Sequence, residues 1–163
     1  FLPDDQRSKR LGDVINPQEL LALQGNADRG RTLFLETQGI QCRNCHRVGG
    51  KGKSLGPDLD HIAKKNSKAK LLDSILDPSR NIDPKFAAWL VETTAGRVHV
   101  GLLGKKTDEE IVLRTTEGKE IRIAADDVEE MFPQRKSLMP DLQLRDMTAE
   151  QVADLLAFLD SLK

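Results

Sequence analysis

Cys42-Arg43-Asn44-Cys45-His46 is the stretch that decides what this chain folds around. Two thiols three positions apart can each bond to one vinyl group of a porphyrin, and the histidine that follows can ligate the iron. The chain contains 2 cysteines, and both lie in this pentapeptide. The motif therefore predicts one covalent haem, a haem c, attached to Cys42 and Cys45 with His46 as its proximal ligand.

Other uses of such a cysteine pair predict features that the chain lacks. A thioredoxin-type redox pair follows a strand in a βαβ unit, whereas residues 27–36 have the pattern of a helix. A structural zinc site needs four ligands, and the remaining histidines, His61 and His99, are far apart in the sequence. The motif thus favours covalent haem over a redox pair, half of a zinc site or a stray disulfide.

Composition narrows the classes of partner. At 163 residues the chain can bury one core with a small appendage. Its formal net charge of -1, with both signs well mixed, gives no reason to expect nucleic acid or a polyanionic membrane surface as partner. No stretch approaches the roughly 18 apolar residues of a spanning helix, so no transmembrane segment is expected in this chain.

The motif also predicts a compartment. Haem c is attached outside the bacterial cytoplasm, and the opening Phe-Leu-Pro-Asp-Asp is no signal peptide. A targeting segment is therefore expected upstream. The chain is interpreted as a mature protein or, in preference, as a domain of a longer one. The expected location is periplasmic or otherwise extracytoplasmic.

Caps and apolar spacing predict helices at both ends of the chain. The helices are expected to begin after the capping residues Asn16, Asn26, Ser67 and Thr148. The first three are expected to end at Gly25, Gly39 and Asp77. Residues 1–15 are expected to form a loose N-terminal segment.

The periodicity changes from helical to alternating between residues 86 and 123. Two hairpins with turns at Ala95-Gly96 and Glu117-Gly118 predict a small antiparallel sheet. Residues 86–132 are therefore interpreted as an inserted β subdomain, which divides a helical core into residues 16–85 and 133–163. His99 alternates with two valines and is expected on the solvent side of its strand.

The sixth coordination position of the iron has several candidates. Met147 is explained as the hydrophobic staple of the last helix, and Met131 as a core-facing residue on a short amphipathic segment. Met139 lies where no helical or strand period is visible, and Pro140 stiffens the backbone after it. Met139 is the preferred distal ligand. The alternatives are that Met139 only fills a gap, or that His61 gives bis-His coordination.

Several motifs together resemble a class I cytochrome c from end to end. They are Gly30 and Phe34, the pentapeptide 42–46, Gly56-Pro57-Asp58-Leu59, Ser137-Leu138-Met139-Pro140, and Phe158. The resemblance implies a mainly α, cytochrome c-like helical fold, here with the small antiparallel sheet inserted. It also implies that the first and last helices cross near Gly30 and Phe158. The carbonyl of Pro57 would accept the ring N–H of His46 and so set its tautomer and donor strength.

A narrower resemblance comes from Ile75-Leu76-Asp77-Pro78-Ser79, followed by a β segment and the Met139 motif. This pattern is similar to the haem-binding domain of exported proteins from Planctomycetes and Verrucomicrobia. Those domains usually form the C-terminal part of large polypeptides with dehydrogenase-like or repeat regions upstream. The resemblance covers residues 16–163.

The function predicted from these features is one-electron transfer rather than catalysis. The expected donor is a dehydrogenase in the same or a partner polypeptide, and the expected acceptor is another redox protein. Lys51 and Lys53, beside the haem motif, are candidates for the contact surface or are plain solvated lysines. One alternative function is a haem-based sensor or small-ligand binder with an open or labile distal site. A peroxidase, which needs a distal acid-base residue, ranks below it.

Overall fold

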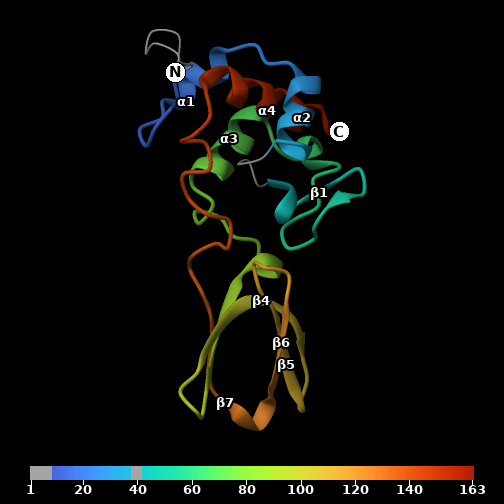
Figure 1. Ribbon diagram of the computed structural model, residues 1–163, viewed down its shortest axis with the longest axis vertical. Coiled ribbons are helices and arrows are strands. Elements are labelled where there is room, and N and C mark those ends of the chain that lie inside the picture. The colour runs from blue at the N-terminus through green and yellow to red at the C-terminus, as the bar shows by residue number, and fades with distance from the viewer. Residues whose placement is uncertain (1–8, 38–41) are drawn as a thin grey trace, which may run out of the picture.

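The computed structural model describes residues 9–37 and 42–163, which form a helical part and a curled sheet stacked along the long axis (Figure 1). The α-helices are α1 (Pro17–Ala22), α2 (Ala27–Leu35), α3 (Lys68–Leu76) and α4 (Ala149–Ser161). Short 3-10 turns are η2 (Cys42–Asn44), η3 (Ile62–Lys64), η4 (Pro84–Phe86) and η5 (Ala125–Asp127).

The predicted caps start the helices. The side chains of Asn16, Asn26 and Ser67 accept hydrogen bonds from backbone N–H groups in the first turns of α1, α2 and α3. Thr148 and Gln151 form the reciprocal capping box of α4. Helix α1 ends at Ala22, earlier than expected. Gly39, the expected end of the second helix, lies outside the described residues.

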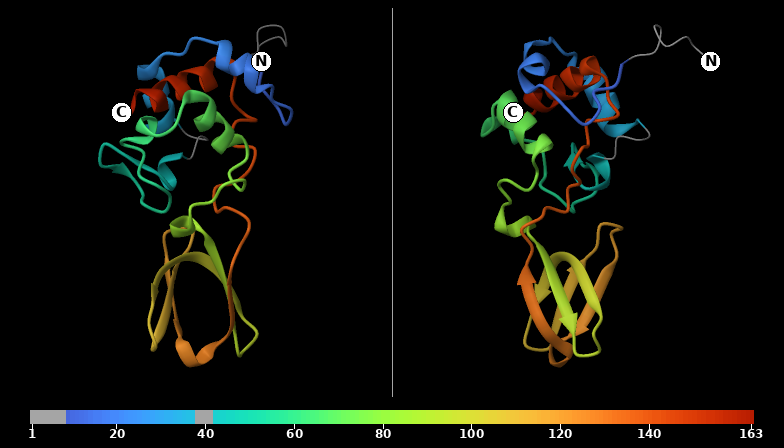
Figure 2. Two further views of the ribbon diagram at one scale, coloured as in Figure 1. Left: turned by 180° about the vertical axis from the view of Figure 1, so that it is seen from behind. Right: turned by 90° about the vertical axis from the view of Figure 1, so that its left-hand side faces the viewer.

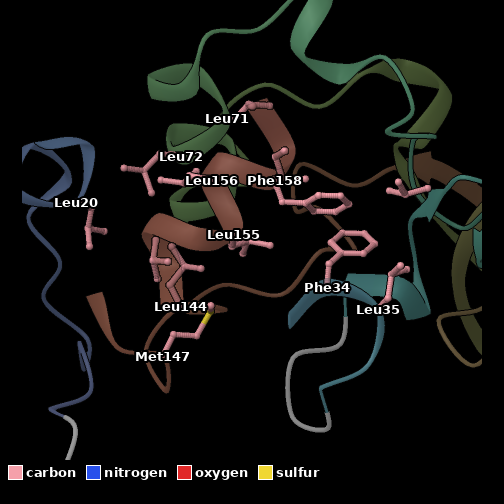
Figure 3. Packing of buried hydrophobic residues seen from close by; sticks show 13 residues of the cluster. Leu20, Phe34, Leu35, Leu71, Leu72, Leu144, Met147, Leu155, Leu156 and Phe158 are labelled. Carbon is pink, nitrogen blue, oxygen red and sulfur yellow. The ribbon is translucent and has the colours of Figure 1, made fainter. Parts of the chain in front are cut away.

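Helices α2 and α4 cross in close contact, as the family resemblance implied. A Cβ built on Gly30 would lie 2.0 Å from the carbonyl oxygen of Asp154 and 2.8 Å from the Cβ of Phe158. The rings of Phe34 and Phe158 pack in a tilted arrangement, with centroids 5.8 Å apart (Figure 3). The expected crossing at Gly30 and Phe158 is therefore confirmed.

The main core lies entirely in the helical part. It joins residues from all four α-helices and from the segment before α4, with Leu20, Phe34, Leu72, Leu155 and Leu156 each at most 2% exposed (Figure 3). Met147 is 2% exposed and belongs to this cluster, so its structural role is confirmed.

The sheet has five strands in the order β6-β5-β4-β3-β7, all antiparallel. Its strands are β3 (Ala88–Thr93), β4 (Val98–Lys106), β5 (Glu110–Arg114), β6 (Glu120–Ala124) and β7 (Val128–Pro133). The sheet curls on itself (Figures 1 and 2) around a separate small core, formed by the buried residues Val91, Ile111, Leu113 and Ile123.

Strand β7 was not expected, and it adds to a strand content that the description "mainly α" understates. Met131 does face a core, but from a strand that pairs with β3, opposite Val91, rather than from a short amphipathic segment of the helical core. The structure is 32% helical and 25% strand, so "mainly α" is not supported. The physical reason is that β7 is defined by pairing with a strand about 40 residues earlier, which no local period reveals.

The orientation of β4 also differs from expectation. Val98 and Val100 are 55% and 43% exposed, whereas His99 is half-buried. His99 lies opposite the fully buried Val91, and residues directly opposite in a sheet share a face. His99 is therefore on the inner face, and its interpretation as a solvent-side histidine was wrong.

Two chain segments connect the helical part to the sheet and run side by side (Figure 2). The N–H of Gln134 donates to the carbonyl of Ala88 at 2.7 Å, which joins them where the sheet begins. Near the N-terminus, Arg10 and Thr148 form an isolated antiparallel β-bridge. The N–H groups of Leu11 and Gly12 donate to the carbonyls of Met147 and Arg145. This part of the segment expected to be loose is thus paired.

Within the described ranges, no helix has both the length and the apolar character needed to cross a membrane.

Candidate haem site

The cysteine motif forms a tight turn that is the next described element after α2. The N–H groups of Cys45 and His46 both donate to the carbonyl of Cys42, at 3.2 and 2.9 Å, and wind η2. The side chain of Arg43 donates to the carbonyl of Leu35 in the last turn of α2. The turn is therefore attached to the helix that precedes it, with Cys42 and Cys45 half-buried.

A small hairpin follows His46. Strands β1 (Arg47–Val48) and β2 (Lys51–Gly52) pair around Gly49 and Gly50, whose φ angles of 56° and 74° suit a two-residue turn. The chain then returns past the motif, where the N–H groups of Leu55 and Gly56 donate to the carbonyl of Cys45.

This return brings the Pro57 carbonyl to the ring of His46. Its oxygen lies 2.8 Å from Nδ1, and because a carbonyl only accepts, Nδ1 carries the hydrogen in that bond. Nε2 is then the nitrogen free to ligate iron. Burial lowers the pKa of His46, while the hydrogen bond to Pro57 acts in the opposite direction. The net lowering of the pKa favours the neutral imidazole, and the hydrogen bond to Pro57 orients its ring.

Gly56 is the residue that lets the ring sit there. A Cβ at this position would lie 2.6 Å from Cε1 and 2.9 Å from Nδ1 of His46. Any larger residue would push the ring away from the Pro57 carbonyl.

The motif opens onto a cavity of about 290 Å³ between the helical core and the sheet. Cys42, Cys45, His46 and Pro57 line it, and so does Met139, which the chain delivers from beyond the sheet. The rest of the wall is mainly apolar and comes from α2, α3, α4 and the connecting segments, with Leu102 from β4. The structure thus brings together the five residues singled out from the sequence.

Burial keeps both thiols protonated near neutral pH. It raises the pKa of Cys42 to about 11. The pKa of Cys45 is also raised by burial, and the charge of Lys53 acts against that rise. Two protonated thiols in an apolar wall are unlike the low-pKa thiolate of a redox pair.

The other candidate ligands lie elsewhere or have other partners. His61 is exposed, does not line the cavity, and has Nδ1 3.2 Å from the carbonyl of Lys163. Met131 packs inside the sheet. Met147 lines the cavity but is 2% exposed within the main core. Met139 is half-buried on a segment without regular structure. Lys51 and Lys53 are exposed beside the motif.

Sequence reasoning missed part of the wall. Phe86 and Leu102 line the cavity, and Leu102 is 2% exposed although it belongs to neither hydrophobic cluster. The sequence shows Leu102 only as a leucine in an alternating strand, and this pattern does not predict that the strand lines a cofactor site.

The residues present fit a haem. Two thiols, an imidazole with a free nitrogen and a thioether face one apolar cavity, and this is the donor set of a covalent haem with His and Met axial ligands. The glycine beside the His46 ring leaves the space that this arrangement needs. The fold and the site therefore define a haem-binding electron-transfer class of protein.

Comparison with known proteins agrees with this class. The Cytochrome c family model matches residues 27–112, which is more than half of the chain, and no curated protein matches it. The chain belongs to the cytochrome c family. Membership implies a covalently bound haem c and redox partners, and such domains are typically extracytoplasmic. The matched range includes the motif and Pro57 and ends before Met139.

Proposed function

We propose that this chain holds one haem c in the cavity and transfers single electrons. Thioether bonds to Cys42 and Cys45 would attach the haem, with His46 and Met139 as the axial ligands. The observation that carries the proposal is that both ends of the chain, 93 positions apart from His46 to Met139, supply these side chains to one cavity. A bound haem supplies a one-electron redox couple.

The chain's own residues set the conditions for that couple. The Pro57 carbonyl holds the ring of His46 and raises its basicity through the Nδ1 hydrogen bond. The mainly apolar wall would limit the access of water to a bound haem, which tunes the reduction potential. Asp83, a carboxylate on the wall, accepts the N–H of Lys85 as the cap of η4.

We also propose the redox partners, the compartment and the domain organisation of this protein. A dehydrogenase in the same or a partner polypeptide would be the donor, another redox protein the acceptor, and the periplasm or a similar compartment the location. We further propose that residues 16–85 and 133–163 act as the cytochrome core, with 86–132 as an inserted subdomain. The resemblance of the sequence motifs to Planctomycetes and Verrucomicrobia haem-binding domains is the basis for proposing a place within a larger exported polypeptide.

The visible spectrum in both oxidation states tests the ligand assignment. A ferric haem with a thioether ligand shows a weak far-red sulfur-to-iron absorption band, and we expect this band in the holoprotein. We expect Met139→Ala to abolish it and the control Met131→Ala to keep it, because Met131 packs inside the sheet. A band that survives Met139→Ala would refute Met139 as the ligand.

One observation favours a second candidate function, a sensor or small-ligand binder. Met139 is half-buried on a segment without regular structure, so it could leave the iron at modest cost. Carbon monoxide binding to the reduced protein at neutral pH would support this candidate, and a carbon monoxide-insensitive six-coordinate spectrum would exclude it.

A further inference from the structure

Two serines hold the backbone of the segment that presents Met139. The N–H of Met139 donates to the hydroxyl of Ser137 at 3.1 Å. The N–H of Ser137 in turn donates to the hydroxyl of Ser79 at 3.1 Å. Ser79 belongs to a different part of the chain, between α3 and η4, and is 58 residues away from Ser137. Two hydroxyl oxygens thus connect the Met139 backbone to the opposite connecting segment.

Ser79 is half-buried beside the cavity wall. Its neighbour Pro78 lines the cavity, as do Ser137 and Leu138. Both serines are half-buried, so water competes less for their hydrogen bonds than it does at an exposed site. The pair therefore joins two walls of the same cavity.

The segment has no comparable support from regular structure. Strand β7 ends at Pro133, and the last sheet-type bond is the one from Gln134 to Ala88. Beyond Gln134, the segment that leads to Met139 is tied to another part of the chain by the hydrogen bond from the Ser137 N–H to the Ser79 hydroxyl. An ion pair at 3.3 Å between Lys136 and Asp141 stays within the exposed surface of the segment.

We propose that Ser79 is a positioning residue for Met139: through Ser137 it fixes the backbone that carries the thioether toward the iron. The proposal rests on the proposed function, because it takes Met139 as the distal ligand. Its physical basis is that a thioether is a weak ligand, so the order of the segment decides how often the sulfur leaves. With Ser79 in place, the segment has less conformational entropy to lose when the sulfur binds.

The test compares Ser79→Ala with the matched control Ser161→Ala. Ser161 is exposed, but its hydroxyl donates to the carbonyl of Phe158 within α4 in a part-buried hydrogen bond, so its removal also costs one hydroxyl hydrogen bond. Imidazole is titrated into the ferric holoprotein, where it must displace the sulfur, while the far-red band is followed. Amide hydrogen exchange at Ser137 is measured by NMR on the same samples.

We expect Ser79→Ala to bind imidazole about fivefold more tightly than the unmodified protein, the effect of losing one ordinary hydrogen bond. The amide of Ser137 should exchange faster in this variant. Ser79→Thr, which keeps a hydroxyl, should restore both properties toward those of the unmodified protein, and Ser161→Ala should change neither.

The outcomes separate this proposal from the one on which it rests. A far-red band missing from the unmodified protein would overturn Met139 as ligand. A normal band with the same imidazole affinity in Ser79→Ala would overturn the positioning role alone. An equal change in Ser161→Ala would also overturn it, because the effect would then be general destabilisation.

Discussion

The imidazole of His46 shows how single residues prepare the site. Its Nδ1 donates to Pro57, and its position depends on the missing side chain of Gly56. A histidine that donates its second N–H to an acceptor is a stronger ligand and has a defined tautomer. The electronic character of the proximal ligand therefore rests on two consecutive residues that do not contact iron.

Gly56→Ala tests this arrangement. The added methyl group would lie 2.6 Å from the His46 ring, so we expect the ring to move away from the Pro57 carbonyl. Because a histidine without this hydrogen bond is a weaker donor, the ferric state loses stabilisation and the reduction potential should rise. A redox titration of the holoprotein measures the reduction potential, with Ser54→Ala, at an exposed position two residues earlier, as the control. An unchanged or lower potential would contradict the prediction.

At the scale of elements, the crossing of α2 and α4 holds the helical part together and places the motif that follows α2. Gly30 allows the backbones to meet, and the Phe34–Phe158 pair fills the space beside it. Asp154 on α4 accepts the N–H of Asn26 at 2.6 Å and both Nε and Nη2 of Arg29, so it also supports the start of α2. The two helices are thus joined by shape and by charge.

Gly30→Ala should destabilise the protein although alanine favours helices. Alanine gains about 1 kcal/mol in helix propensity, but its methyl group would overlap the carbonyl of Asp154. We expect a net loss of about 1–3 kcal/mol in the free energy of unfolding, as for an overpacked core. Chemical denaturation measures it. The exposed neighbour Arg31, changed to alanine, should stay within about 0.5 kcal/mol, and a stabilised Gly30→Ala would contradict the close crossing.

The buried carboxylate of Asp154 predicts a pH dependence. The hydrogen bonds from Arg29 are the main cause that lowers the pKa of Asp154, and the N–H of Asn26 adds to them. The folded-state pKa is therefore below the unfolded value of about 3.9. Its contribution to stability is fully present above that value and is lost as pH falls through the folded-state pKa.

Thermal unfolding followed by circular dichroism tests this link. Below about pH 4 the midpoint temperature should fall more steeply with pH in the unmodified protein than in Asp154→Asn. The exposed Asp73 provides the control, because Asp73→Asn should keep the steep dependence. Parallel curves for the unmodified protein and Asp154→Asn would show that this carboxylate does not contribute.

At the scale of the whole molecule, the sheet and the helical part have separate cores and meet at the cavity. No residue of the sheet belongs to the main core cluster of the described residues. Leu102 reaches the cavity wall, and Nη1 of Arg114 donates to the carbonyl of Ser54 at 3.3 Å. The strand ends are adjacent, because Gln134 donates to Ala88. The sheet therefore closes one side of the site without forming the helical core.

Replacing residues 89–132 by a Gly-Ser-Gly linker tests this division. We expect the four α-helices to remain, because their core keeps all its members, and the cavity to lose the wall at Leu102. Circular dichroism and the far-red band report the helices and the ligation. Leu102→Ala in the intact chain is the comparison, with an expected cost of about 2–5 kcal/mol if the wall packs as a core does. Loss of helical signal on deletion would contradict the separate cores.

Local patterns predicted a large part of this protein. The pentapeptide 42–46 is a contiguous chemical unit, and the caps at Asn16, Asn26, Ser67 and Thr148 act on amides within three residues, so both can be read without a fold. Two of the four hairpins among the described residues, those with turns at Ala95-Gly96 and Glu117-Gly118, were visible from turn residues. The hairpin at Gly49-Gly50 was missed, because its strands are two residues long and show no period.

What the sequence by itself determined is therefore the haem chemistry, the helix starts and the presence of a sheet between them. Only the tertiary structure decided the pairing of β7 with β3, the inward face of His99, and the meeting of Met139, Leu102 and the motif at one cavity. The physical reason is range. Caps, turns and attachment motifs act over a few bonds, whereas strand partners and cavity walls are chosen by which distant surfaces bury one another.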